Sequence, residues 1–368
     1  QQPPPSVIDV WPDGGTAVLR ANIPGATQTG QNPPRDGVVD RYEYADGTAL
    51  AVSAIPNTFP HTELDFGSLI WTAFGSRLLT DMGYGDIGGT WGRYNVEVTP
   101  DNNPVGHNTF VLEEAVHPLV EHSNASQING EVGTVERLEL DGVDFVSLDG
   151  SDVYGASEPL FGGLLPPGVD SDSRQPPRWL AGFNRVLIPV PVGHYLVVDL
   201  FRARPEVGEV TGQEHWHVRS GQNPPEEDGC VGDYVHVDVI APDRLQIIPT
   251  CNSIISDGPA ESVGNITGAG LYGGHFEMGE LVHFTNRLNR PEYFQRARWV
   301  PQAASADGVR VFLLTSATDI DGLPESDVAH RTCGEAECFD VQVGERMYTL
   351  TFAEGVSNWT LTGLTGWE

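Results

Sequence analysis

The chain has 368 residues, 51 acidic side chains and a formal net charge of −31 at pH 7. All 20 of its basic residues are arginine. An acidic surface of this kind repels nucleic acid, anionic membranes and, at long range, polyanionic sugars, which argues against nucleic acid as a partner. No stretch reaches ~18 uninterrupted apolar residues, so no membrane insertion is predicted.

The predicted elements are strands. The chain holds 43 glycines and 28 prolines, and its apolar runs are β-branched and bounded by turn residues, which is typical of strands. The first strand pair is predicted to turn at Asp13-Gly14-Gly15, and a second at Gly75-Ser76. In chain order the predicted strands and strand pairs cover residues 7–23, 42–55, 64–74, 76–84, 108–116, 133–150, 185–203, 214–221, 234–250, 274–288, 296–303, 309–317, 337–353 and 358–364.

These strands predict an all-β fold, a large antiparallel β-sandwich built from stacked sheets. Residues 1–6 form a proline-rich tail in this interpretation, and 7–267 form the sandwich. Residues 268–368 either continue the sandwich or form a small C-terminal β subdomain.

Four cysteines fall at positions that fit no zinc or thioredoxin motif. The preferred pairing is two local disulfides, Cys230–Cys251 and Cys333–Cys338, each closing a polar loop. Disulfides indicate an oxidising compartment, so an extracellular protein is predicted, secreted or at the cell surface. The alternative is four reduced, buried cysteines.

A polar cluster is predicted at the ends of the strands between residues 61 and 109. His61 and Glu63 share one face of a strand because residues two apart point the same way. The returning strand ends at Asp81, and His107 stands at the entry to a later strand. One imidazole and two carboxylates could form a tetrahedral Zn²⁺ site, but Asp and His also commonly terminate strands without a metal.

The order of these motifs resembles the β-sandwich portion of heparinase II/III-like polysaccharide lyases, a group that includes oligo-alginate lyases. The matching motifs are His-x-Glu-x-Asp-x-Gly-Ser at 61–68, Asp-x-Gly at 81–83 and His-Asn-Thr at 107–109. Residues 11–21 and 185–218 resemble further strand pairs of that portion. The recognisable motifs span about Val7 to Val218.

This resemblance implies β-elimination on a polysaccharide that contains uronic acid. It assigns His61 as the catalytic histidine facing the substrate and Glu63, Asp81 and His107 as metal ligands. Glu63 departs from the family, in which histidine is usual, so Ca²⁺ becomes an alternative to Zn²⁺. The structural alternative is a hydrogen-bonded cluster that pins the strand ends without metal.

Further residues are candidates for binding the substrate. Tyr84 and Asn108 lie beside the motifs, and Arg185 could grip a sugar carboxylate with two hydrogen bonds. Salt bridging to the 51 acidic residues is the commoner explanation for Arg185 and for other arginines of the chain such as Arg296 and Arg298. A histidine pair and five tryptophans are expected to pack in the sandwich rather than to bind metal or sugar: His215, His217, Trp71, Trp91, Trp179, Trp216 and Trp299.

The family also places a helical toroid before its β-sandwich, and the toroid supplies the remaining catalytic residues. No such helical region is visible in this sequence. Two functions therefore stay open. One is the β-domain of a polysaccharide lyase that works with a separate helical toroid chain. The other is a non-catalytic extracellular protein, either glycan-binding or self-assembling, that keeps the lyase sandwich.

Overall fold

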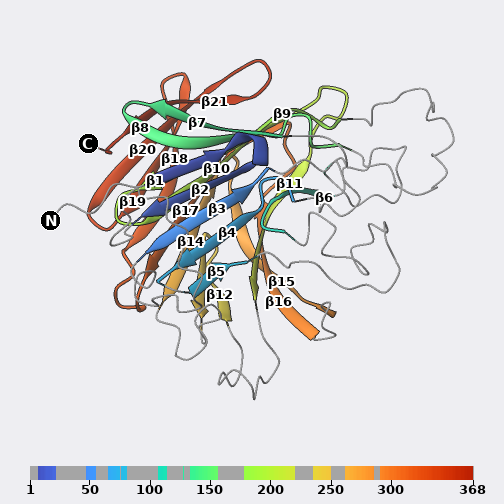
Figure 1. Cartoon of the computed structure of the whole chain (residues 1–368). Coiled ribbons are helices and arrows are strands. Elements are labelled where there is room, and N and C mark those ends of the chain that lie inside the picture. The colour runs from blue at the N-terminus through green and yellow to red at the C-terminus, as the bar shows by residue number, and fades with distance from the viewer. Residues whose placement is uncertain are drawn as a thin grey trace.

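The computed structural model describes residues 7–21, 47–54, 65–74, 76–80, 107–113, 127, 133–155, 178–219, 235–249, 262–285 and 291–367. Within these ranges the structure is almost entirely β, and its one helix is the 3-10 turn Pro12–Gly14. No described helix has the length and apolar character needed to cross a membrane. The predicted all-β sandwich is confirmed (Figure 1).

The N-terminal sheet has five antiparallel strands in sequence order, each paired with the next. Its strands are β1 (Val7–Trp11), β2 (Thr16–Ala21), β3 (Thr48–Ser53), β4 (Leu69–Ala73) and β5 (Ser76–Leu79). The first hairpin turns as predicted, because Gly15 adopts φ +59° and its N–H donates to the carbonyl of Pro12.

The central sheet has eight strands, and consecutive chain segments do not always lie side by side in it. Its order is β12 (Val235–Ala241), β13 (Arg244–Pro249), β14 (Val263–Gly270), β17 (Asp307–Ala317), β10 (His194–Ala203), β9 (Leu180–Val190), β8 (Val143–Asp149) and β7 (Thr134–Leu140). All neighbouring pairs are antiparallel.

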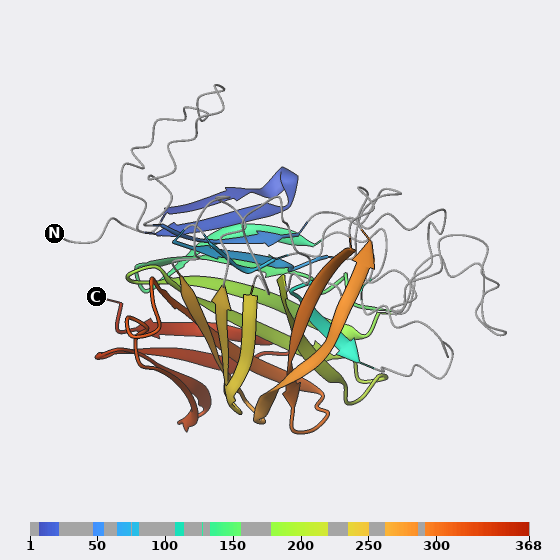
Figure 2. The ribbon, with the colours of Figure 1, turned by 90° about the horizontal axis from the view of Figure 1, so that it is seen from below.

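Two four-stranded sheets complete the described fold. The lateral sheet has the order β15 (Gly274–Thr285), β16 (Pro291–Pro301), β11 (Thr211–Arg219) and β6 (Phe110–Glu113). The C-terminal sheet has the order β18 (Ser326–Cys333), β19 (Ala336–Val343), β20 (Arg346–Glu354) and β21 (Trp359–Thr365). Figure 2 shows the central strands between the blue N-terminal strands on one side and the red C-terminal strands on the other.

Both faces of the central sheet are buried over β8, β9, β10 and β17, and alternate residues of these strands serve two different cores. The first core joins the central sheet to the N-terminal and lateral sheets, and the second joins it to the C-terminal sheet. Strand β10 shows the alternation. Its side chains Tyr195, Val197 and Phe201 lie in the first core, whereas Leu196, Val198 and Leu200 lie in the second.

The chain from residue 268 onward contributes to three of the four sheets. Residue 268 lies inside β14, and β17 is a neighbour of β14 in the central sheet. Only β18–β21 form a sheet of their own, and that sheet packs through the second core. The proposed division of the chain at 267/268 stays a prediction.

One of the two predicted disulfides lies in the described residues. Cys333 and Cys338 are bonded, with Cα atoms 5.9 Å apart, and they close the turn between β18 and β19. That prediction is confirmed. Cys230 and Cys251 lie outside the described residues.

Candidate functional site

The predicted site divides into residues that the structure describes and residues that it does not. His61, Glu63, Asp81 and Tyr84 lie outside the described ranges. The described part consists of the chain segments next to them in the sequence. These segments are the turn Asp65–Ser68, residue Thr80 directly after β5, and the segment His107–Thr109 that leads into β6.

The turn Asp65–Ser68 is held by its backbone. The N–H of Ser68 donates to the carbonyl of Asp65 at 2.8 Å, and the N–H of Gly67 donates to Ser53 in β3 at 2.6 Å. Gly67 has φ +77°, and a Cβ there would lie 3.4 Å from both Arg185 Nη1 and Thr109 Oγ1. The positive φ therefore favours glycine in this turn, and a Cβ there would be in van der Waals contact with the buried guanidinium.

Asn108 connects three strands through its side-chain amide. Its Nδ2 donates to the carbonyls of Leu69 in β4 at 2.7 Å and Thr80 at 2.9 Å. Its Oδ1 accepts from the backbone N–H of His217 in β11 at 2.5 Å. Because Asn108 follows His107, these bonds fix His107 beside the chain at Thr80, the residue that precedes Asp81. The His107 side chain is fully buried.

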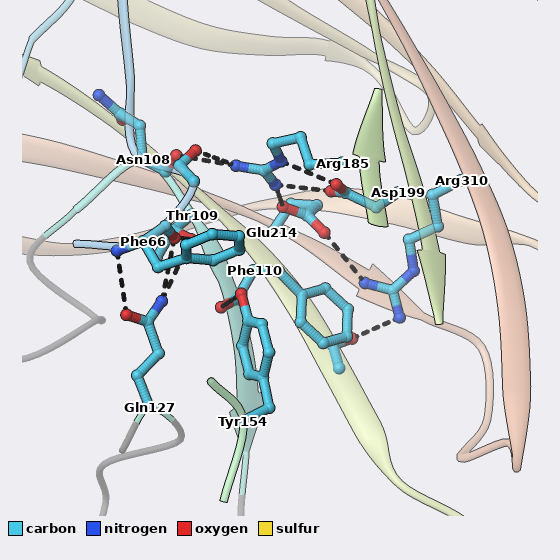
Figure 3. A network of polar contacts seen from close by, with 12 residues as sticks. Phe66, Asn108, Thr109, Phe110, Gln127, Tyr154, Arg185, Asp199, Glu214 and Arg310 are labelled. Atoms are coloured by element: carbon cyan, nitrogen blue, oxygen red, sulfur yellow. Dashed lines mark hydrogen bonds and ion pairs between the residues drawn. The ribbon is translucent and has the colours of Figure 1, made fainter. Parts of the chain in front are cut away.

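A second buried amide, Gln127, binds the peptide groups of Phe66. Its Oε1 accepts from the Phe66 N–H at 3.0 Å and its Nε2 donates to the Phe66 carbonyl at 3.1 Å (Figure 3). Thr109 Oγ1 donates to the same carbonyl at 2.5 Å. The Phe66 ring packs edge-on against Tyr154 and Phe183 in the first core. The Thr109 side chain thus joins the His107–Thr109 segment to the backbone of the turn at Phe66.

Beneath both segments lies Arg185 of β9, which has no exposed surface. All five of its N–H groups have hydrogen-bond partners. Nε and Nη2 donate to the two oxygens of Asp199, and Nη2 also donates to Glu214. Nη1 donates to the carbonyls of Gly67 at 2.5 Å and Asn108 at 3.2 Å (Figure 3).

Arg310 of β17 completes this network. Asp199 lies directly opposite Arg185 on one neighbouring strand and opposite Arg310 on the other. Arg310 Nη2 donates to the carbonyl of Gly212 at 2.8 Å, and its guanidinium carbon lies 5.1 Å from the ring centre of Phe110. Glu214 Oε1 and Arg310 Nη1 are 3.6 Å apart and share no hydrogen bond. Two arginines and two acids therefore balance each other in formal charge.

The pKa shifts in the network follow from burial and from the charged groups that lie nearby. Burial opposes the charged form of Arg185, but its ion pairs with Asp199 and Glu214 outweigh burial and raise its pKa. Burial raises the pKa of Glu214 well above its usual range, and the nearby Asp199 adds to that rise. Burial lowers the pKa of Arg310. Burial also raises the pKa of Tyr154, whose hydroxyl donates to the carbonyl of Phe110.

These placements give Arg185 and Asn108 structural roles, because every described polar group on both side chains is bonded inside the protein. Their predicted contact with substrate stays a prediction. Asp199, Glu214, Arg310 and Gln127 were not singled out from the sequence. The available signal was the position of Asp199 and Arg310 inside otherwise apolar strands, where a buried charge needs a partner.

The remaining candidates behave as packed residues. The two histidines of β11 are buried, and their rings lie 6.2 Å apart, as expected of a packed strand face. Among the described residues, no group of three or more His, Cys, Asp or Glu side chains could hold a metal ion. Arg298 forms an ion pair with Glu277 at 3.3 Å. Four of the five tryptophans are confirmed as buried: Trp71, Trp179, Trp216 and Trp299. Trp91 lies outside the described residues.

No protein-family model matches the chain, and no curated protein sequence matches it. Solved structures do match. The chain is similar to a heparinase III structure with a TM-score of 0.60 and 11% identity, and the match covers 95% of this chain and 43% of that one. A heparinase III structure with methylated lysines gives a TM-score of 0.58 at 12% identity, with coverage of 95% and 42%.

A heparan sulfate lyase mutant from Pedobacter heparinus is also similar, with a TM-score of 0.54 and 10% identity over 83% of this chain and 39% of that one. The chain thus spans about two-fifths of the length of these lyases. At 10–12% identity these matches establish the fold and leave the activity open. The resemblance inferred from the motifs is confirmed at that level: this chain has the β-sandwich fold found in heparinase III.

Proposed function

We propose that the chain is the β-domain of an extracellular polysaccharide lyase and acts on glycans that contain uronic acid. The single observation that carries the proposal is the contact of Asn108 Nδ2 with the carbonyl of Thr80 at 2.9 Å. This bond joins Asn108, the residue after His107 in the sequence, to Thr80, the residue before Asp81. The fold match over 95% of the chain supports the same assignment.

The proposed reaction is a β-elimination. A base removes the proton from C5, beside the uronate carboxylate, and the electron pair forms the C4=C5 double bond as the C4–O bond breaks. The leaving oxygen takes a proton, and the enolate-like charge must be stabilised on the way. His61 is the proposed histidine facing the substrate, and Tyr84 is a proposed substrate contact. A helical toroid, as a separate chain or elsewhere in a longer protein, would supply the remaining acid–base groups.

Glu63, Asp81 and His107 are the proposed metal ligands. An imidazole and two carboxylates fit the donor chemistry of Zn²⁺, and a carboxylate in place of a histidine also admits Ca²⁺. Full burial of His107 and the hydrogen bonds of Asn108, the residue after it, are compatible with a ligand held in one orientation. A bound divalent cation would supply positive charge near the developing enolate.

Secretion is proposed from the Cys333–Cys338 disulfide, because disulfides persist in oxidising compartments. The anionic glycans proposed as substrates are found outside the cell, which agrees with that location. Non-denaturing mass spectrometry of the secreted protein, with and without reductant, would test both the disulfide and the presence of further chain or partner.

The decisive experiment is an elimination assay on the purified chain, alone and with a helical toroid domain. Heparan sulfate, other glycosaminoglycans and alginate serve as substrates, and absorbance of the unsaturated uronate product is followed. We expect His61→Ala to lower kcat/KM by roughly 10²–10⁴-fold, the usual contribution of a positioned acid–base group. His330→Gln is the matched control, because His330 lies in the C-terminal sheet and pairs with Glu337.

Equal activity in the two variants would remove His61 from the mechanism. No product from any substrate, with a toroid present and at several salt concentrations, would overturn the lyase proposal. Retained binding of those glycans in that case would support the alternative of a non-catalytic glycan-binding protein.

A further inference from the structure

Two segments that adjoin the proposed site lie against one buried side chain. The turn Asp65–Ser68 follows His61 and Glu63 in the chain, and Asn108 follows His107. The carbonyls of Gly67 and Asn108 both accept from Nη1 of Arg185, at 2.5 and 3.2 Å. A single nitrogen therefore sets the separation of the two segments.

The position of that nitrogen is itself fixed. Asp199 binds Nε at 2.7 Å and Nη2 at 2.6 Å, which makes a two-pronged ion pair across neighbouring strands. Glu214 of β11 binds Nη2 from the lateral sheet at 2.6 Å. The guanidinium plane is thus held by both the central and the lateral sheet, and Nη1 points at the two carbonyls (Figure 3).

The contacts of Asn108 extend this control to the third segment. While its backbone carbonyl accepts from Arg185, its side chain donates to Thr80, the residue before Asp81. The three described segments that adjoin the proposed ligands and catalytic residue in the sequence are therefore bonded to Arg185 directly or through Asn108.

We propose that Arg185 is a positioning residue of the lyase site, holding the turn at Gly67 and the segment at Asn108 in the register that catalysis needs. This inference rests on the proposed function for its catalytic consequence. Lysine cannot replace Arg185 in this role, because an ammonium is a point charge and lacks the planar fork that reaches four partner groups at once.

The first test compares Arg185→Lys with Arg310→Lys. Both variants keep the charge of the network. Arg310 donates to Gly212 and packs on Phe110, so it contacts the far end of the 107–112 segment, but its described hydrogen bond does not reach the turn at Gly67. We expect hydrogen exchange in peptides covering residues 65–69 and 107–112 to accelerate about tenfold or more in Arg185→Lys, as expected when a buried hydrogen bond is lost. We expect Arg310→Lys to change exchange in residues 65–69 less than about twofold.

A second pair of variants leaves all four charged side chains of the network unchanged. It tests the proposal even if a lysine variant does not fold. Gly67→Ala places a Cβ 3.4 Å from Arg185 Nη1 at φ +77°, whereas Gly142→Ala carries the same strain at φ +79° with no atom within 4 Å. Only Gly67→Ala should loosen the segment at 107–112. Equal exchange in the members of both pairs would overturn the proposal.

Kinetics then separate positioning from general stability. In an active lyase, Arg185→Lys and Gly67→Ala should lower kcat about tenfold or more with KM nearly unchanged. Misplacement of a catalytic group by about 1 Å reduces the stabilisation of the transition state more than the binding of the substrate. Unchanged kcat in both variants would contradict positioning. If the wild-type chain shows no lyase activity under any condition, the proposed function fails, and the exchange comparison still decides whether Arg185 holds the two segments.

Discussion

The two faces of the central sheet are built by opposite means. The face toward the C-terminal sheet is covered by aliphatic and aromatic side chains such as Val198, Leu200 and Leu350. The face toward the lateral sheet includes two buried arginines and two buried acids among its apolar neighbours. The same strands contribute to both, so the difference lies in alternate residues of one sequence.

This difference has a physical meaning. Apolar packing is non-directional and tolerates small shifts, whereas an ion-paired guanidinium accepts only one arrangement of its partners. The C-terminal sheet needs only to be attached, but the segments near the proposed site need fixed positions. Polar contacts therefore occur on the face where geometry matters for the proposed site.

The two faces also respond to pH with opposite sign. The pKa of Glu214 is raised, so its contribution to stability is complete below its unfolded value near 4.5 and is lost as pH rises through the folded value. His194 begins β10 and shares the face of Leu196 and Val198. Burial lowers its pKa to about 4, so its contribution is complete above about 6.5 and is lost as pH falls.

The largest expected effect is at the polar face. Asp199→Ala leaves Arg185 buried without its main partner, and we expect it to lower the free energy of unfolding by about 3–5 kcal/mol. Urea denaturation measures this value. Asp144→Ala is the control, since Asp144 pairs with Arg137 at the surface and should cost less than about 1 kcal/mol. Similar losses in the two variants would contradict the contrast between the polar network and the surface.

At the apolar face, Leu350→Ala should lower the free energy of unfolding by about 3 kcal/mol, because it leaves a cavity in a fully buried position. Urea denaturation and hydrogen exchange measure the effect. Exchange in residues 107–112 should stay at the wild-type rate under native conditions. Faster exchange there would show that the two faces are not independent.

His194→Gln tests the pH response of the apolar face. Between pH 7.5 and pH 4.5 the wild type should lose up to about 3 kcal/mol of stability from this residue, since each pKa unit corresponds to about 1.4 kcal/mol. Over the same pH range, the free energy of unfolding of the glutamine variant should fall by up to about 3 kcal/mol less than that of the wild type. Parallel stability curves for the two proteins would rule out His194 as the source.

The smallest expected effect is at the disulfide. The Cys333→Ala/Cys338→Ala double variant should cost about 2 kcal/mol, because the bond closes a short loop with a sequence separation of 5. Thermal unfolding measures the loss. Adding reductant to the wild type should produce the same change, and reductant should not affect the double variant. A reductant effect on the double variant would point to another cause.

Much of the fold was predictable from local patterns. The hairpin at Asp13-Gly14-Gly15, the burial alternation of β4 and the short-range disulfide each depend on a few neighbouring residues. The motif order also indicated the fold that the solved lyases share. What these cases have in common is that the physical cause lies within a short stretch of chain.

The roles of Arg185 and Asn108 were not predictable in the same way. Both were candidates for substrate contact, and salt bridging to acids was the commoner explanation for Arg185. The sequence did not indicate which acids would pair with it. Their burial depends on β9, β10, β11 and the Gly67 turn meeting at one point. No sequence pattern within a single strand predicts that these elements come together. A lone charge in an apolar strand does indicate that a partner must exist.

The saturation of the Arg185 guanidinium has an evolutionary consequence. No other natural side chain offers the same five donors. A single substitution at position 185 therefore leaves the surrounding carboxylates without the donors that they bind. Positions 185, 199, 214 and 310 should therefore change together or not at all among descendants of this chain. At 12% identity to a known structure, such a linked set would be a more durable mark of shared ancestry than any single motif residue.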